Sequence, residues 1–289
     1  MKKKISIILT LLIVCFSLSG CFNNNDIEGA NITTTIYPIE YLVSRLYDSN
    51  SKISSIYPNG IDTTTYKLTK KQINNYAQNT NIFIYNGLSD EKEIARTLIN
   101  KNKKIQIVDV SYGLKYTNGV EELWLSPNNY LMLANTIRTD LEELSSSKYA
   151  AEKIEKNYKN LEEDLSILDA QIKNIADTAK TNGKETIVVG DNSFKFLDSY
   201  GFNTISVANE NDITNTIKNK FKNKEYQTIF VKDKKNLPDP IKDLIDNYGA
   251  NVVEINPMTT LSDEERKNND TYLTIMNDFI SNLSNTVLK

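Results

Sequence analysis

The sequence predicts an α/β protein with two parallel-sheet lobes, each built from four strand–helix units and joined to the other by one long rigid helix. Short β-rich runs alternate with helical segments through residues 31–144, and the same alternation returns through residues 185–289. Between them, residues 148–180 contain no Gly or Pro and carry apolar side chains at alternating spacings of four and three. A chain of 289 residues is long enough for two such lobes.

The first 20 residues have the pattern of a secretory signal. Lys2, Lys3 and Lys4 precede an apolar run over 5–16, which is too short for a comfortable membrane span. The ending Leu18-Ser19-Gly20-Cys21 resembles the lipobox of bacterial lipoproteins, and this resemblance implies cleavage before Cys21 and acylation of its thiol. A plain signal peptide with an incidental cysteine is the alternative. Residues 21–30 are polar and lack periodicity, so we expect a flexible tether.

Four strand–helix units are expected in the N-terminal lobe, residues 31–144. The predicted strands are 32–36, 53–57, 81–85 and 104–108, and the predicted helices are 38–47, 69–77, 89–100 and 127–144. Thr69 and Gln72 have the spacing of a capping box, which indicates a helix start. Ser126 and Pro127 are typical of the N-cap and the first position of a helix.

Residues 148–180 are predicted to form one amphipathic helix about 45 Å long. Its apolar stripe consists of Ile154, Tyr158, Leu161, Leu165, Leu168, Ile172 and Ile175. A dimeric coiled coil is the alternative. Because only about three heptads are present and α/β segments flank them, a single helix packed along both lobes is favoured.

The C-terminal lobe, residues 185–289, repeats the pattern. Its predicted strands are 186–189, 204–207, 227–231 and 251–255, and its predicted helices are 193–200, 212–221, 240–248 and 270–287. Gly201 and Gly249 stand where a left-handed residue ends a helix. Asp239 and Pro240 are interpreted as an N-cap and first helical position.

Composition excludes several classes of site. The chain has no histidine, which rules out a Ser-His-Asp triad, a Cys-His pair and every zinc site that uses histidine. Its two cysteines, Cys15 and Cys21, exclude a multi-disulfide scaffold and a four-cysteine zinc site. The formal net charge of −3 gives no reason to expect a nucleic-acid partner.

Ligands of open α/β sheets lie beyond the carboxyl ends of the strands, so we expect the site between the two lobes. Four loops at strand ends supply the candidate side chains. They are Thr64, Glu122, Asp191, and Thr259 or Thr260. Tyr66 and Trp124 are also expected to line the cleft, with Trp124 packed under it rather than in contact with a ligand. Glu122 and Asp191 are the candidate metal ligands.

Several motifs appear in order on this repeated frame. They are Ile36-Tyr37-Pro38, Pro58-x-Gly60-x-Asp62, Ile82-Phe83-Ile84-Tyr85-Asn86-Gly87, Trp124-Leu125-Ser126-Pro127, Phe194-x-x-Leu197-x-x-Tyr200-Gly201, Ile229-Phe230-Val231, and the tail from Asn256-Pro257 to Tyr272-x-x-x-Met276. Through them the chain resembles the zinc- and manganese-binding solute-binding lipoproteins of bacterial metal ABC importers, an adhesin-like family. The resemblance covers nearly all of the chain after the signal. It implies a lipid-anchored protein on the outer face of the cell membrane, with an ABC permease and its ATPase as partners; we expect a monomer.

This sequence departs from the family at the ligand positions. Thr64 and Glu122 stand where the family has histidine, Asp191 stands at the third ligand position, and Thr259 or Thr260 at the fourth. Hard oxygen donors suit Mn²⁺ or Ca²⁺ at low affinity, and zinc is not expected. The alternative interpretations are a solvated loop charge for Glu122 and a helix N-cap for Asp191.

Two non-enzymatic functions are therefore considered. One is a solute-binding protein that captures a solute between the lobes and delivers it to a permease. The other is a degenerate family member that acts as a surface interaction or adhesin-like lipoprotein, or that binds a non-metal solute. Glu122 and Asp191 could form an acid–base pair, but no nucleophile, phosphate loop or cofactor motif accompanies them, so no enzyme is predicted. The basic run from Lys232 to Lys235 is typical of a solvated surface.

Overall fold

The structure is a computed structural model that describes residues 27–47 and 51–288. The predicted signal, Cys21 and the first part of the predicted tether lie outside the described residues. The prediction of a flexible tether is wrong for its described end, because Ile27 and Ala30 are 1% and 6% exposed and belong to the hydrophobic core. Within the described residues, no helix is both long enough and apolar enough to cross a membrane.

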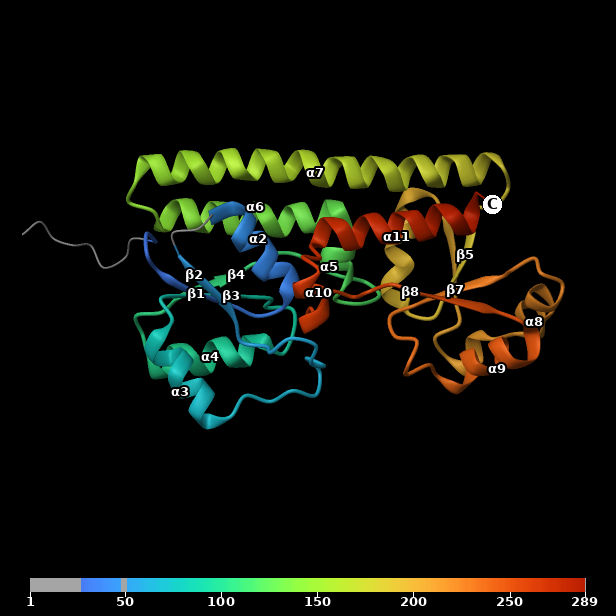
Figure 1. The fold of residues 1–289 in the computed structure, drawn as a ribbon, viewed down its shortest axis with the longest axis horizontal. Coiled ribbons are helices and arrows are strands. Elements are labelled where there is room, and N and C mark those ends of the chain that lie inside the picture. Colours follow the sequence, from blue (N-terminus) through green and yellow to red (C-terminus); the bar gives the residue numbers. More distant parts are fainter. Residues whose placement is uncertain (1–26, 48–50, 289) are drawn as a thin grey trace, which may run out of the picture.

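Two four-stranded parallel sheets form the centres of the two lobes, as predicted (Figure 1). The first sheet contains β1 (Asn31–Thr34), β2 (Lys52–Ser55), β3 (Ile82–Tyr85) and β4 (Gln106–Asp109), in the order β2-β1-β3-β4. The second contains β5 (Thr186–Val189), β6 (Asn203–Ser206), β7 (Thr228–Val231) and β8 (Asn251–Glu254), in the order β6-β5-β7-β8. The two lobes therefore have the same strand order, and the carboxyl ends of the strands in each sheet lie at one edge.

Helices connect the strands of each sheet. Those of the N-terminal lobe are α2 (Tyr37–Tyr47), α3 (Lys70–Asn79), α4 (Glu91–Lys101), α5 (Glu122–Leu125) and α6 (Pro127–Leu144). Those after β5 are η1 (Asn192–Tyr200), η2 (Glu210–Asp212), α8 (Asn215–Lys222), α9 (Asp239–Tyr248), α10 (Asp263–Lys267) and α11 (Tyr272–Val287). The predicted capping box of Thr69 is present, and Gly201 and Gly249 have the left-handed backbone expected at helix ends, with φ of 105° and 70°.

Two local predictions need refinement. The helix predicted over 193–200 is present as a 3₁₀-helix, in which Phe194, Leu197 and Tyr200 recur at a spacing of three and are all buried. Three residues per turn places these side chains on one face. Asp239 is the first residue of α9 rather than its N-cap, which is Pro238, and the Asp239 carboxylate instead pairs with Lys242 at 2.8 Å.

The long helix α7 (Lys148–Thr181) spans both lobes (Figure 1). Ser147 caps its first turn by accepting a hydrogen bond from the Ala150 amide at 3.3 Å. One face packs on α2 and α6 of the N-terminal lobe, and further along α7 contacts η1 and α11. Because one hydrophobic core contains Leu165 together with residues of both lobes, α7 is a shared structural element rather than a loose linker.

Candidate functional site

The chain returns from β8 to the N-terminal lobe through residues 256–270, and this return segment forms hydrogen bonds with that lobe. The Tyr37 amide donates to the Thr259 carbonyl at 3.0 Å, and the Thr260 hydroxyl donates to the Ile61 carbonyl at 3.0 Å. The predicted site residues Thr259 and Thr260 therefore bond to the backbone of the opposite lobe.

Arg266 of α10 strengthens the same contact. Its guanidinium makes a bidentate pair with the Glu40 carboxylate at 2.9 and 2.7 Å, and its Nε donates to the Asn59 side chain at 2.6 Å. Bidentate pairs of this kind fix orientation as well as distance. The return segment is thus held on α2 and on the loop after β2.

Trp124, which was expected to line the cleft, is only 2% exposed and lies in the core beneath the return segment. Its indole nitrogen donates to the Pro257 carbonyl at 2.7 Å, and its own carbonyl accepts the Tyr272 hydroxyl at 2.7 Å. The Tyr272 ring stacks on Tyr130 with centroids 4.0 Å apart. These contacts join the start of α6 to the start of α11.

Thr64 and Tyr66 lie on the loop after β2. The Thr64 amide and hydroxyl both donate to one carboxylate oxygen of Asp62, at 2.9 and 2.6 Å, and these bonds lower the pKa of Asp62. Thr64 is exposed and the hydrogen bonds that place it are local. Tyr66 is half-buried, with its ring against Tyr57 and its hydroxyl accepting from Gln72 at 2.8 Å.

Glu122 is buried, with 7% exposure, so its interpretation as a solvated loop charge is wrong. One carboxylate oxygen accepts the Asn118 amide at 2.9 Å and the other accepts the Thr117 amide at 3.1 Å. A carboxylate that accepts backbone N–H groups fixes the loop that supplies them. Glu122 therefore holds the segment that leads into α5.

Asp191 is the N-cap of η1, as one of its two interpretations predicted. Its Oδ1 accepts the Ser193 amide at 2.8 Å and the Ser193 hydroxyl at 2.5 Å. Its Oδ2 lies 2.9 Å from the ammonium of Lys232. Burial acts to raise the pKa of Asp191, but the bonds from Ser193 and Lys232 outweigh it and lower that pKa.

Lys232 follows β7 directly and reaches across to the N-terminal lobe. Its Nζ lies 2.6 Å from Oε1 of Glu121 and 2.9 Å from Oδ2 of Asp191. Burial acts to lower the pKa of Lys232, but these two carboxylates outweigh it and raise that pKa. The interpretation of Lys232 as part of a solvated run is wrong, because its side chain is only 25% exposed. We call Glu121, Asp191 and Lys232 the lysine bridge.

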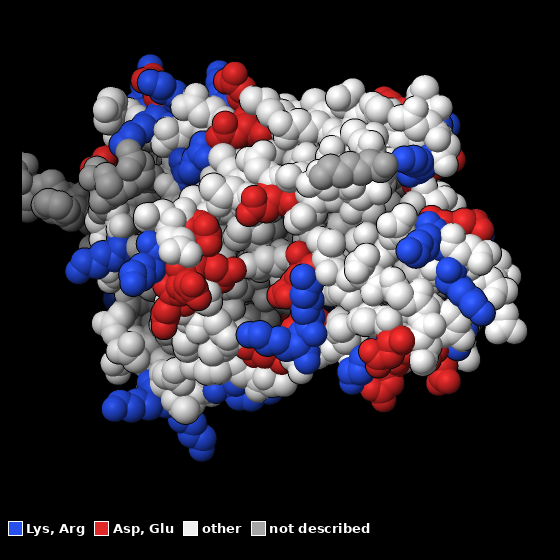
Figure 2. Space-filling view, turned by 45° about the vertical axis from the view of Figure 1, so that its right-hand side comes forward, with Lys and Arg blue, Asp and Glu red and all other residues white. Residues whose placement is uncertain are grey.

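The two loops that carry the lysine bridge are in close contact. A Cβ added to Gly119 would lie 3.0 Å from the Ser193 Cβ and 3.2 Å from a carboxylate oxygen of Glu121. A side chain at residue 119 would therefore be crowded, and Ser193 or Glu121 would have to shift by a few tenths of an ångström. Figure 2 shows acidic and basic side chains close together near the middle of one face of the molecule.

The structure thus brings Asp191 to the boundary of the lobes and gives Thr64 and Glu122 partners in their own loops. Within residues 27–47 and 51–288, no group of three or more Cys, Asp or Glu side chains is placed to hold a metal ion. Sequence reasoning missed Lys232 and Glu121 as bridge residues because each lies in a run of charges that is typical of an exposed surface.

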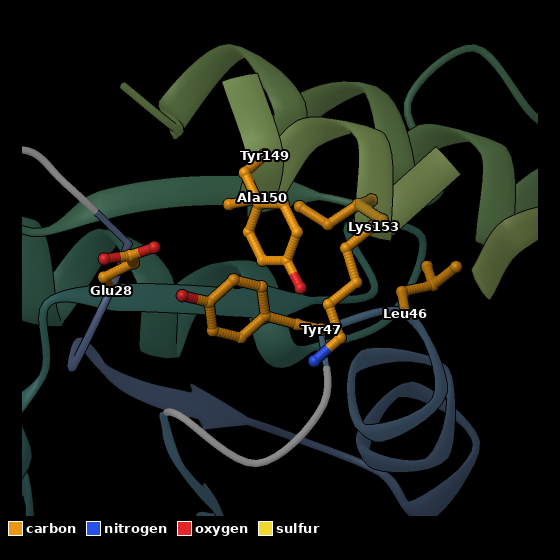
Figure 3. Close-up of a pocket in the computed structure, with 7 residues that line it drawn as sticks. Glu28, Leu46, Tyr47, Tyr149, Ala150 and Lys153 are labelled. Atoms are coloured by element: carbon orange, nitrogen blue, oxygen red, sulfur yellow. The ribbon is translucent and has the colours of Figure 1, made fainter. Parts of the chain in front are cut away.

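Three of the cavities among the described residues lie away from these side chains. A small one of about 40 Å³ is formed where the end of α2 meets the start of α7, with Tyr47, Tyr149 and Lys153 in its wall (Figure 3). Another, of about 350 Å³, lies between α7 and α11. The third, of about 320 Å³, is bordered by Glu254, Glu265 and other residues between β8 and α11. Thr64, Glu122 and Asp191 line none of the three.

Glu91, at the start of α4, is a buried carboxyl that the sequence did not distinguish. It is 5% exposed and accepts the Asn86 amide at 2.9 Å. Burial raises the pKa of Glu91 from 4.5 to about 7, with a further contribution from the charge of Asp109, although the hydrogen bond from the Asn86 amide opposes the shift. Glu91 lies in the N-terminal lobe and not in the lysine bridge.

Comparison with known proteins gives one family and a set of related folds. Residues 32–286 match the family described as zinc-uptake complex component A, periplasmic (ZnuA). A search of curated proteins gave no match.

Solved structures resemble this fold closely. The structure of zinc-bound AdcA from Streptococcus pneumoniae has a TM-score of 0.72 at 19% identity, covering 90% of this chain, which spans only 58% of that protein. The ZnuA-like domain of the same AdcA gives 0.73 at 20% identity, covering 90% of this chain and 99% of the domain. The metal-dependent lipoprotein YcdH from Bacillus subtilis gives 0.74 at 20% identity, covering 90% and 100%.

Proposed function

Because this chain belongs to the family of the periplasmic zinc-uptake complex component A, we propose that it captures a solute between its two lobes and delivers it to an ABC permease and its ATPase. Members of the family are metal-binding extracytoplasmic components of ABC importers, and the family is not one of enzymes. The observation that carries the proposal is the extent of the match, since residues 32–286 include both sheets and α7. Cross-linking the protein in cells and recovering an ABC permease tests it; recovery of unrelated surface partners alone would contradict it.

We also propose that the protein is a monomer held on the outer face of the cell membrane by acylated Cys21. The sequence Leu18-Ser19-Gly20-Cys21 supports this anchor, and the Bacillus subtilis protein of the same fold is named a lipoprotein.

Replacing Cys21 is expected to release the protein from the membrane. Without the thiol, Cys21→Ala has no acceptor for the lipid, so in cell fractionation it should leave the membrane fraction. Cys15→Ala is the matched control, because Cys15 lies inside the apolar run of the predicted signal and should leave the anchor intact. A Cys21→Ala protein that fractionates like the wild type would contradict the lipid anchor.

For the solute, we propose negligible affinity for zinc and at most weak binding of a hard divalent cation such as Mn²⁺ or Ca²⁺. The ligand positions offer oxygen donors only, and zinc prefers nitrogen and sulfur ligands. Glu122 and Asp191 are the proposed ligands, and both already accept hydrogen bonds within the protein, which supports a low affinity.

Calorimetry with Zn²⁺, Mn²⁺ and Ca²⁺ tests this proposal. We expect no submicromolar zinc binding, and any weak Mn²⁺ or Ca²⁺ signal should disappear in the double variant Glu122→Gln, Asp191→Asn. Because the chain has no histidine, that signal should be flat between about pH 6 and 8. The surface variant Glu93→Gln, Asp177→Asn removes two charges elsewhere and is the control. Submicromolar zinc binding would refute the proposal.

The second candidate function is an interaction or adhesin-like lipoprotein, or a receptor for a non-metal solute. It is favoured by the absence of histidine at each ligand position and by the lysine bridge, in which an ammonium group already lies between the two carboxylates. No heat of binding with any of the three ions would favour this alternative.

A further inference from the structure

We propose that the ammonium group of Lys232 is a built-in cation that ties the two lobes together and keeps divalent cations out of the space between Glu121 and Asp191. This inference deepens the proposed low affinity for metal ions. It rests on that proposed function and identifies Lys232 as the residue that keeps the affinity for divalent cations low.

The bridge connects parts of the chain that only the fold brings together. Glu121 lies in the N-terminal lobe just before α5, whereas Asp191 and Lys232 follow β5 and β7 of the C-terminal lobe. The three side chains are 18% (Glu121), 32% (Asp191) and 25% (Lys232) exposed, so the charges are partly removed from water. Opposite charges in such a setting interact more strongly than at an open surface.

The Lys232 ammonium neutralises part of the negative charge of the Glu121 and Asp191 carboxylates, which a metal ion would otherwise do. One oxygen from each lobe contacts the same nitrogen, at 2.6 and 2.9 Å. Two carboxylates held close together without a cation repel each other. With Lys232 present, a divalent cation would have to displace the ammonium group from both carboxylates. If the ammonium group stayed in place, it would repel the divalent cation.

The surroundings of the bridge also leave little opportunity for a metal ion to bind. The other oxygen of Asp191 already accepts two hydrogen bonds from Ser193. Gly119 lies close to Ser193, since a Cβ at residue 119 would be 3.0 Å from the Ser193 Cβ, so the loops are already in contact across the boundary. The lobes therefore need no bound ion to meet here.

Removing the charge of Lys232 while keeping its length is the direct test. Lys232→Met leaves Glu121 and Asp191 facing each other, so its melting temperature without metal should fall by roughly 5–10 °C. Millimolar Mn²⁺ or Ca²⁺ should restore that loss, with an association constant at least about tenfold above that of the wild type.

Three further variants locate the effect. The triple variant Lys232→Met, Glu121→Gln, Asp191→Asn should show no response to cations, because its site carries no charge. Lys232→Arg should keep the ion pairs with Glu121 and Asp191 and gain no cation binding. Lys218→Met is the matched control: it breaks the pair of Lys218 with Asp243, 3.0 Å apart and both within the C-terminal lobe, and should gain no cation binding.

The gain of cation binding decides the proposal. If Lys232→Met folds only with Mn²⁺ or Ca²⁺ present, the proposal is supported; if it gains no response to either ion, or stays unfolded with both, the proposal is overturned. Cation binding by the wild type that equals that of Lys232→Met would also overturn it. These measurements use the purified protein without a permease, so failure of the transport proposal is detected separately by the cross-linking experiment.

Discussion

Leu165→Pro is expected to unfold both lobes in a single transition. Leu165 lies in the interior of α7 and is 1% exposed. Proline there removes a backbone hydrogen bond and clashes with the preceding turn, at a cost of about 3 kcal/mol or more. Loss of the buried leucine adds roughly 2–5 kcal/mol. The sum is comparable to the whole stability of a typical domain, roughly 5–15 kcal/mol.

Calorimetric or circular-dichroism melting measures this effect. Lys148→Pro is the matched control, because residue 148 is the first helical position after the N-cap Ser147, where proline is tolerated. It should melt within a few degrees of the wild type. If Leu165→Pro instead leaves one lobe melting as in the wild type, then α7 does not couple the lobes.

Glu91→Gln is expected to stabilise the protein at pH 8 by up to about 3 kcal/mol, and to have little effect at pH 4.5. The pKa of Glu91 in the folded protein is about 7, above its ordinary value of 4.5. The folded state therefore holds this proton more tightly than the unfolded state does. Stability conferred by Glu91 falls as the pH rises from about 4.5 to 7, because folding then requires a buried charge. Glutamine stays neutral throughout and can still accept the Asn86 amide.

Denaturant unfolding of wild type and variant at pH values between 4.5 and 8 gives this difference directly. Glu93→Gln is the control in the same helix. Glu93 is exposed and pairs with Arg96 of its own helix at 3.1 Å, so its loss should change the free energy of unfolding by less than about 1 kcal/mol at each pH. A stability difference for Glu91→Gln that does not vary with pH would contradict the raised pKa.

Most of the fold could be predicted because its signals are local. The helix predicted over 127–144 is observed as Pro127–Leu144, and the strand over 186–189 as Thr186–Val189. Caps, glycines and apolar periodicity mark such elements within a few residues of their ends. For the segment 193–200 the sequence predicts only a helix, because apolar residues three apart share a face in an α-helix as well as in a 3₁₀-helix, and the structure shows the 3₁₀ geometry.

The candidate site was harder to predict because its residues take partners that are remote in the sequence or are backbone groups. Loop positions correctly placed Asp191 at the lobe boundary, and its capping role followed from residue type. The same reasoning could not show that the Glu122 carboxylate turns into its own loop and accepts the Thr117 and Asn118 amides.

The sequence by itself determined the two lobes, the long helix and, through the order of its motifs, the family, because each of these depends on a pattern that a continuous stretch of chain carries. Only the tertiary structure decided which charges meet. Lys232 and Glu121 are 111 residues apart, and whether a charged side chain is solvated or bridged depends on where a distant loop places its partner. No local period encodes that distance, so a lysine in an ordinary basic run proved to be the cation between the lobes.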